Sequence, residues 1–121
     1  MSEKEILAEY TEKIKKIYGE HLHYVILYGS RARGDFRPDS DYDIMVLVDL
    51  SEDEIRKLRD ETVWVDIYYM DNYDMYFSTF VKNIVFFNKW VRAHPFYNNV
   101  WNEGVALYDA EKDAGATINT K

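Results

Sequence analysis

The sequence predicts a layered α/β domain, or one of the related α+β type, because strand-like segments alternate with helix-like segments. The length of 121 residues suits one domain and allows an ordinary core without disulfide bonds. An apolar share of 47%, with charges spread along the chain, is typical of a globular protein. We therefore expect one domain over residues 1–109 and a polar, flexible tail over residues 110–121.

The first elements have clear patterns. Apolar residues at helical spacing predict a helix over residues 4–17, and Gly19 marks its end. The run HYVILYG, residues 23–29, predicts a buried strand. Ser30 is then well placed to cap a short helix over RAR, residues 31–33.

A second strand and a second long helix follow. The run YDIMVLVD, residues 42–49, is nearly continuous in apolar residues, as expected for a central strand covered on both faces. Ser51 and Glu54 have the spacing of a capping box, which predicts a helix from Ser51 to about residue 60.

The second half of the chain is expected to add two strands and a long helix. The segment TVWVDIYYM, residues 62–70, is rich in β-branched and aromatic residues and predicts a third strand. A long helix is expected over residues 73–93, ended before Pro95. Apolar residues cover most of its circumference, which indicates either a deeply buried helix or a contact face for another chain. A short helical segment, Gly104 and a brief strand over residues 105–109 close the domain.

Composition limits the classes of partner. The formal net charge of −7 lacks the basic surplus with which proteins bind long DNA or RNA, since phosphate neutralisation supplies most of that affinity. Cysteine is absent, which excludes disulfides and thiolate metal sites and fits a reducing cytoplasm. We find no signal-peptide pattern and no apolar run near the ~20 residues of a membrane helix. Small anionic ligands stay compatible with this charge if metal ions or arginines neutralise them.

The stretch YGSRARGDFRPDSDYD, residues 28–43, is the candidate functional segment. Gly29 ends the first strand where the backbone must approach another group closely, and Ser30 starts a short helix. The free N–H groups of a helix start and a serine hydroxyl can bind an anion. A Gly-Ser pair after a strand is weak evidence by itself, so the neighbouring carboxylates decide its interpretation.

Aspartates alternate at the end of this stretch. Side chains at i and i+2 of a strand share a face, so Asp41 and Asp43 project together, while Asp39 is expected in the loop. Two carboxylates ~4 Å apart repel by about 4 kcal/mol at an effective dielectric constant of about 20. Such a pair needs a cation. Arginine could supply it, but Mg²⁺ suits clustered carboxylates beside phosphate oxygens.

Asp66 is isolated among the apolar residues of the expected third strand. A carboxylate inside a core costs several kcal/mol unless it is paired or metal-bound. Asp66 therefore either faces water on an edge strand or lies beside Asp41 and Asp43. In the second arrangement the three carboxylates could hold two metal ions and assist attack on a phosphorus atom.

These motifs together resemble the nucleotidyltransferase superfamily that includes DNA polymerase β. The matching residues, in chain order, are Gly29, Ser30, Asp41, Asp43 and Asp66. The form GSRARG…SDYDIMVLVD and the closing NEGVALYD are similar to its minimal, single-domain branch. The resemblance covers residue 24 to about residue 109. It implies the nucleotidyltransferase fold, with a small mixed β-sheet flanked by helices.

The resemblance also implies a nucleotide site. Gly29 and Ser30 would hold the β- and γ-phosphates of ATP. Arg31 and Arg33 are candidates for phosphate contact, although a solvated helix face would explain them equally well.

Catalysis would then use the carboxylates. By the resemblance, Asp41 and Asp43 would bind two Mg²⁺ ions. Asp66 would bind the ion near the acceptor and help to remove the proton of the acceptor hydroxyl. The superfamily reaction is attack of that hydroxyl on the α-phosphate, with transfer of a nucleoside monophosphate and release of pyrophosphate.

Minimal nucleotidyltransferases resemble the antitoxin of a toxin–antitoxin pair. The implied partner is a HEPN-domain toxin, on which the antitoxin attaches AMP to a tyrosine, and the implied location is the cytoplasm. We expect no membrane and no direct nucleic-acid partner, and a homo- or hetero-oligomer is open. Two alternatives also stay open: a non-catalytic antitoxin that occludes its partner, and a small-molecule nucleotidyltransferase like those that inactivate aminoglycosides.

Overall fold

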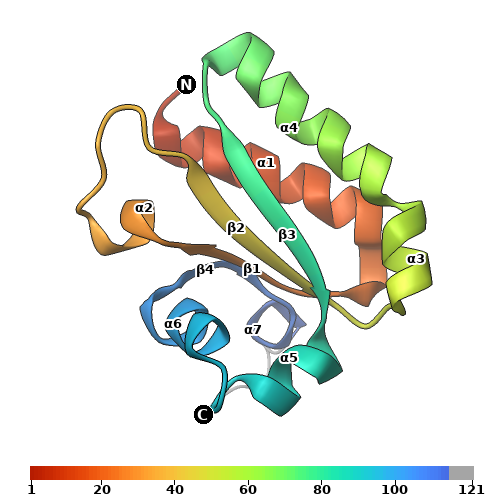
Figure 1. Cartoon of the computed structure of the whole chain (residues 1–121). Helices are drawn as coiled ribbons and strands as arrows, with labels where there is room; N and C mark the ends of the chain where they lie inside the picture. The colour runs from red at the N-terminus through yellow and green to blue at the C-terminus, as the bar shows by residue number, and fades with distance from the viewer. Residues whose placement is uncertain (115–121) are drawn as a thin grey trace.

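The computed structural model describes residues 1–114, which form a four-stranded sheet with helices on both faces (Figure 1). The strands are β1 (Leu22–Tyr28), β2 (Tyr42–Val48), β3 (Phe77–Asn83) and β4 (Val105–Asp109), in the spatial order β3-β2-β1-β4. Strand β1 is antiparallel to both β2 and β4, whereas β2 and β3 are parallel. The sheet is therefore mixed, and β2 lies in its interior as predicted.

Helices connect and cover these strands. They are α1 (Glu3–Tyr18), α2 (Ser30–Arg33), α3 (Glu52–Lys57), α4 (Arg59–Tyr73), α5 (Ile84–Trp90), α6 (Pro95–Glu103) and α7 (Ala110–Ala114), with a 3₁₀ turn at Gly19–His21. Helix α1 ends at Gly19, and Ser51 and Glu54 form a capping box at the start of α3, both as predicted. No helix within residues 1–114 has the length and apolar character needed to cross a membrane.

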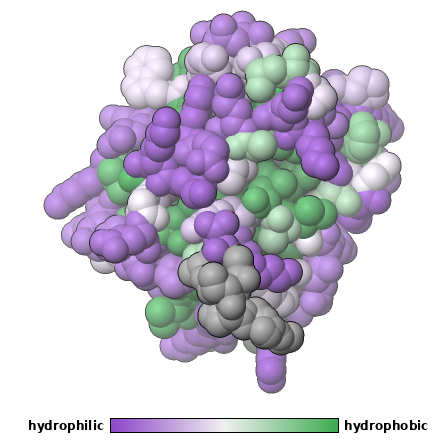
Figure 2. All heavy atoms as spheres, turned by 180° about the vertical axis from the view of Figure 1, so that it is seen from behind, coloured by the Kyte–Doolittle hydropathy of each residue, from purple (hydrophilic) through white to green (hydrophobic). Residues whose placement is uncertain are grey.

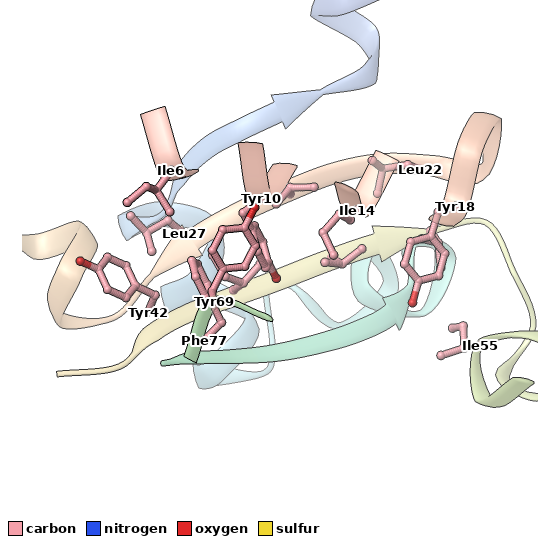
Figure 3. Close-up of a cluster of buried hydrophobic side chains, with 14 of the residues drawn as sticks. Ile6, Tyr10, Ile14, Tyr18, Leu22, Leu27, Tyr42, Ile55, Tyr69 and Phe77 are labelled. Carbon is pink, nitrogen blue, oxygen red and sulfur yellow. The ribbon is translucent and has the colours of Figure 1, made fainter. Parts of the chain in front are cut away.

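One face of the sheet packs against α1 and α4. Tyr42, Ile44 and Val46 of β2 point to this side and join a core that includes Tyr10 of α1 and Tyr69 of α4. Figure 3 shows several of these side chains, with the ring of Tyr10 against that of Phe77. The rings of Tyr10 and Phe77 are stacked with centroids 4.2 Å apart.

The other face of the sheet packs against α5 and α6. Met45 and Leu47, which alternate with the residues of the first core along β2, contact Phe87 of α5 and Val100 of α6. Strand β2 is consequently buried on both faces, which explains its nearly continuous apolar sequence.

The prediction of a strand over residues 62–70 is wrong, because this segment lies inside helix α4. Its β-branched and aromatic residues have strand propensity, but propensity yields to packing where a helical face can be buried. Thr62 and Tyr69 are buried, and Val65 and Tyr73 pack against the same core. These positions are three or four residues apart and form one face of a helix.

The predicted long helix over residues 73–93 is also wrong in its first half. Strand β3 occupies Phe77–Asn83, and only α5 is helical. Phe77, Thr79 and Val81 alternate along β3 towards the α1 and α4 side, which is strand spacing. Asn83 then caps α5 by accepting a hydrogen bond from the backbone N–H of Phe86.

The sequence left two interpretations of the apolar segment over residues 73–93, a deeply buried helix or a contact face for another chain, and each fits different residues. Phe87 is fully buried under the sheet, whereas Phe86 and Trp90 are more than one-third exposed. In the C-terminal tail, which the sequence predicts to be polar and flexible, Ala110–Ala114 form helix α7 directly after β4. Residues 115–121 of the predicted flexible tail lie outside the described residues.

Candidate active site

The Gly29–Ser30 turn joins β1 to the short helix α2. Gly29 has φ 74°, a left-handed conformation that favours glycine, and its carbonyl accepts hydrogen bonds from the N–H groups of Ala32 and Arg33, both 3.0 Å. A Cβ atom on Gly29 would collide with the carboxylate of Asp43. The missing side chain therefore lets the turn and the carboxylate lie against each other, as the sequence predicted for a close backbone approach.

Of the two carboxylates, Asp41 and Asp43, only Asp43 lies within a strand of the sheet. It lies on β2 opposite Tyr28 of the antiparallel strand β1, on the sheet face that carries α5 and α6. Burial raises the pKa of Asp43, the charge of Asp41 raises this pKa further, and Arg33 lowers it. Burial also raises the pKa of Tyr28 to about 12, and the charge of Asp43 contributes to this shift. The charges of Asp41 and Arg33 thus both act on the carboxyl group of Asp43, in opposite directions.

This pair of carboxylates fits a divalent metal ion. No side-chain cation of residues 1–114 forms an ion pair with Asp41 or Asp43. Within the same residues, no group of three or more histidine, cysteine or acidic side chains is arranged to hold a metal. Mg²⁺ suits such a site, because it commonly takes one or two carboxylates and completes its octahedron with water and substrate phosphates.

The two arginines of α2 have different surroundings. Arg31 has a side chain only 10% exposed, and it donates hydrogen bonds to the backbone carbonyls of Pro38 and Ser40. Arg33 has a side chain 45% exposed and pairs with Asp35 and with Glu103 of α6, at 3.2 and 3.3 Å. Arg33 is the one of the two whose charge reaches Asp43.

Glu103 is a neighbour of the site that sequence reasoning missed. It lies at the end of α6, seventy residues beyond Arg33, and contacts it only because α6 packs on the same face of the sheet. Its place in NEGVALYD, the second segment similar to minimal nucleotidyltransferases, is the only sequence signal that marks it.

Asp66 lies on the opposite side of the sheet from Asp43. Its carboxylate Oδ1 accepts a hydrogen bond of 3.0 Å from the hydroxyl of Thr79, which also bonds to the hydroxyl of Tyr10 in the core under α1. Burial raises the pKa of Asp66 to about 7, and the bond from Thr79 lowers it. The expected placement of Asp66 beside Asp41 and Asp43 rested on the wrong strand assignment and is wrong with it.

A cavity of about 360 Å³ next to Asp66 explains how this carboxylate keeps some contact with solvent. The cavity lies between α3, α4 and the edge strand β3, and its lining includes Thr62, Thr79 and Lys82. A role of Asp66 as a metal ligand stays a prediction, and this position does not favour it.

Comparison with known proteins identifies the family. The family model described as polymerase beta nucleotidyltransferase matches residues 12–113. The chain belongs to this nucleotidyltransferase family. Two relatives from Methanocaldococcus jannaschii, each named as a protein adenylyltransferase, are 30% and 32% identical to it. The alignments cover 89% and 85% of this chain and 100% and 96% of the relatives.

Solved structures share the fold of this nucleotidyltransferase. A chain of a toxin–antitoxin crystal structure with AMP-PNP matches with a TM-score of 0.52 at 18% identity, over 90% of this chain and 78% of that one. A chain of a mutant MntA–HpeT toxin–antitoxin structure matches with a TM-score of 0.53 at 15% identity, with the same coverage. The predicted nucleotidyltransferase fold is therefore confirmed.

Proposed function

We propose that this nucleotidyltransferase transfers AMP from ATP to a tyrosine hydroxyl of a HEPN-domain toxin and acts as the antitoxin of the pair. The observation that carries the proposal is the Asp41–Asp43 carboxylate pair: neither carboxylate has an ion-paired cation among residues 1–114, and that of Asp43 lies against Gly29 of the Gly29–Ser30 turn. The two relatives named as protein adenylyltransferases support the reaction. The structural neighbours are chains of toxin–antitoxin complexes, which suggests the class of partner.

In this proposal the turn binds the triphosphate. Gly29 allows the phosphates to approach the backbone, and the hydroxyl and N–H of Ser30 donate to phosphate oxygens. Arg33 lies on the exposed side of α2 and adds a positive charge that can exchange its partners Asp35 and Glu103 for a phosphate.

The carboxylates would hold the metal ions. Asp41 and Asp43 would bind Mg²⁺, which supplies charge neutralisation at the phosphates and activation of the attacking hydroxyl. The negative charges of Asp41 and Asp43 favour Mg²⁺ binding and disfavour nucleotide without metal, because the phosphates would otherwise face two carboxylates. We leave Asp66 out of this metal site because of its place on the other sheet face.

The acceptor would come from the partner chain. Large apolar side chains that are exposed on the described surface offer contact areas for it, among them Phe80 of β3, Val85, Phe86 and Trp90 of α5, and Phe96 and Trp101 of α6. Figure 2 shows that the back of the molecule also presents apolar residues in patches between polar ones. A location in the cytoplasm, where ATP is available, is part of the same proposal.

Mass spectrometry of the partner tests this function. The partner that copurifies with the chain is incubated with ATP and Mg²⁺, with an Asp41→Asn/Asp43→Asn double variant as control. A gain of one or more AMP masses on a tyrosine, absent in the control, is the expected result. Tight binding without a mass change would support the occluding antitoxin instead. If the partner neither binds this protein nor gains AMP, small-molecule acceptors become the alternative.

A thermal shift tests the nucleotide site without any acceptor. ATP with Mg²⁺ should raise the melting temperature, because a ligand at one hundred times its dissociation constant adds about 2.7 kcal/mol of stability. The Asp41→Asn/Asp43→Asn double variant should lose this shift. Equal shifts in both proteins would place nucleotide binding elsewhere.

A further inference from the structure

Arg31 is largely buried at the junction between the Gly29–Ser30 turn and the loop that leads to Asp41 and Asp43. It belongs to α2, which starts directly after Gly29. Its Nε and Nη2 atoms donate to the carbonyl of Ser40 at 3.3 and 3.1 Å, and Nη2 also donates to the carbonyl of Pro38 at 3.2 Å. The loop over residues 34–41 has no helix or strand, so these bonds tie its end to α2.

Two aromatic rings add to this anchorage. The guanidinium carbon of Arg31 lies 4.2 Å from the ring centroid of Phe36 and 4.3 Å from that of Tyr42. Both distances are within the range of cation–π attraction. Phe36 precedes Asp41 in the loop and Tyr42 follows it, so the same guanidinium contacts the chain on both sides of that carboxylate.

The charge of Arg31 is directed to the sheet face away from Asp43. The nearest carboxylate to its guanidinium is that of Glu3 in α1, at 3.9 Å, and the hydroxyl of Tyr42 donates to the same carboxylate at 2.6 Å. Tyr42 belongs to the core under α1 and α4, whereas Asp43 points to the α5 and α6 side. Arg33, by contrast, acts on the pKa of Asp43.

We propose that Arg31 is a positioning residue: it fixes Asp41 relative to the Gly29–Ser30 turn and does not bind phosphate. Arginine suits this role because its planar guanidinium can bond to two carbonyls and stack on rings at the same time, which lysine cannot reproduce. The consequence for the reaction rests on the proposed function. When the loop is loose, Asp41 is no longer held beside Asp43, and the metal affinity falls more than the affinity for the nucleotide.

Amide hydrogen exchange of the protein without nucleotide and metal tests the anchorage itself. Arg31→Gln should increase exchange at Ser40, Asp41 and Tyr42 by about tenfold or more, whereas Arg33→Gln, on the same helix, should leave it unchanged. Phe36→Leu removes one ring without leaving a buried charge unmatched and should give a smaller increase at the same amides. Unchanged exchange at these amides in both Arg31→Gln and Phe36→Leu would overturn the proposal.

Kinetics then separate positioning from phosphate binding. Arg31→Gln should raise the Mg²⁺ concentration for half-maximal transfer by about tenfold with little change in KM for ATP. Arg31→Lys should bring this Mg²⁺ concentration only part of the way back to the wild-type value. Arg33→Gln should raise the KM for ATP with little change in the Mg²⁺ concentration for half-maximal transfer. A raised KM for ATP with an unchanged Mg²⁺ requirement in Arg31→Gln would assign Arg31 to phosphate and refute positioning. If the wild-type chain transfers no AMP, the proposed function fails, while the exchange data still decide whether Arg31 holds the loop.

Discussion

Two partly buried aspartates on opposite faces of the sheet, Asp43 and Asp66, show how the candidate metal site differs from a single buried carboxylate. Burial is the main cause of a raised pKa in both. The second influence differs: Asp43 is near another carboxylate, Asp41, whereas Asp66 accepts a hydrogen bond from Thr79. The neutral hydroxyl of Thr79 stabilises the charged form of the Asp66 carboxylate. The two neighbouring charges of Asp41 and Asp43 instead favour the binding of a metal ion. Burial and an elevated pKa therefore do not identify the site by themselves.

The largest difference between the two aspartates is expected in transfer activity. Asp43→Asn should reduce AMP transfer at least about a thousandfold, or about 4 kcal/mol, because half of the proposed metal site is removed. The rate is measured from the AMP mass gained by the partner. Unfolding of the metal-free variant serves as control and should occur at the same or a slightly higher temperature. Transfer at the normal rate would remove Asp43 from the mechanism.

A smaller effect is expected from the contact between the turn and Asp43. Gly29→Ala should reduce transfer by about a hundredfold, because the added Cβ collides with the Asp43 carboxylate and displaces one of the two groups. Gly34→Ala is the matched control: Gly34 also has a left-handed φ, of 93°, but a Cβ there would meet no atom within 4 Å. Both variants share the backbone strain, so equal losses of transfer would attribute the effect to strain alone.

The smallest effect is expected from Asp66, and it concerns stability. Asp66→Asn should retain transfer and raise the free energy of unfolding above pH 7 by about 1–2 kcal/mol, a value reduced to allow for the remaining solvent contact of this carboxylate. The folded-state pKa is raised to about 7, above the unfolded value of about 3.9. Between these two values the folded state binds more protons than the unfolded state. The contribution of Asp66 to stability therefore falls as the pH rises through this window.

Denaturant unfolding between pH 4 and 8 measures this contribution. The wild-type chain should lose stability relative to Asp66→Asn as the pH rises, and the curves should be closest near pH 4. Asp71→Asn, at an exposed position of the same helix, is the control and should follow the wild-type curve. A large loss of transfer in Asp66→Asn would instead support the metal-ligand role that the sequence suggested.

The sequence alone determined the part of the site that is local along the chain. Gly29, Ser30, Asp41 and Asp43 lie within fifteen residues that end one strand and begin its antiparallel neighbour, so strand alternation and the turn bring them together. The strands β1, β2 and β4, the helix α1 and the α3 capping box were predicted for the same reason, since each depends on nearby residues.

Only the tertiary structure decided the secondary structure and surroundings of residues whose neighbours are distant in sequence. The segment around Asp66 has strand propensity, yet it is helical because Thr62 and Tyr69 find partners in α1: their hydroxyl groups bond to Tyr18 and to Glu9. Residues 77–83 form a strand because the edge of β2 is free to pair with them. Arg31 and Arg33 look alike in the sequence, but their surroundings differ. Arg31 lies against Glu3, Phe36 and Tyr42. Arg33 pairs with Glu103 of α6. Local patterns cannot encode these choices, because long-range contacts outweigh the small differences in propensity between helix and strand.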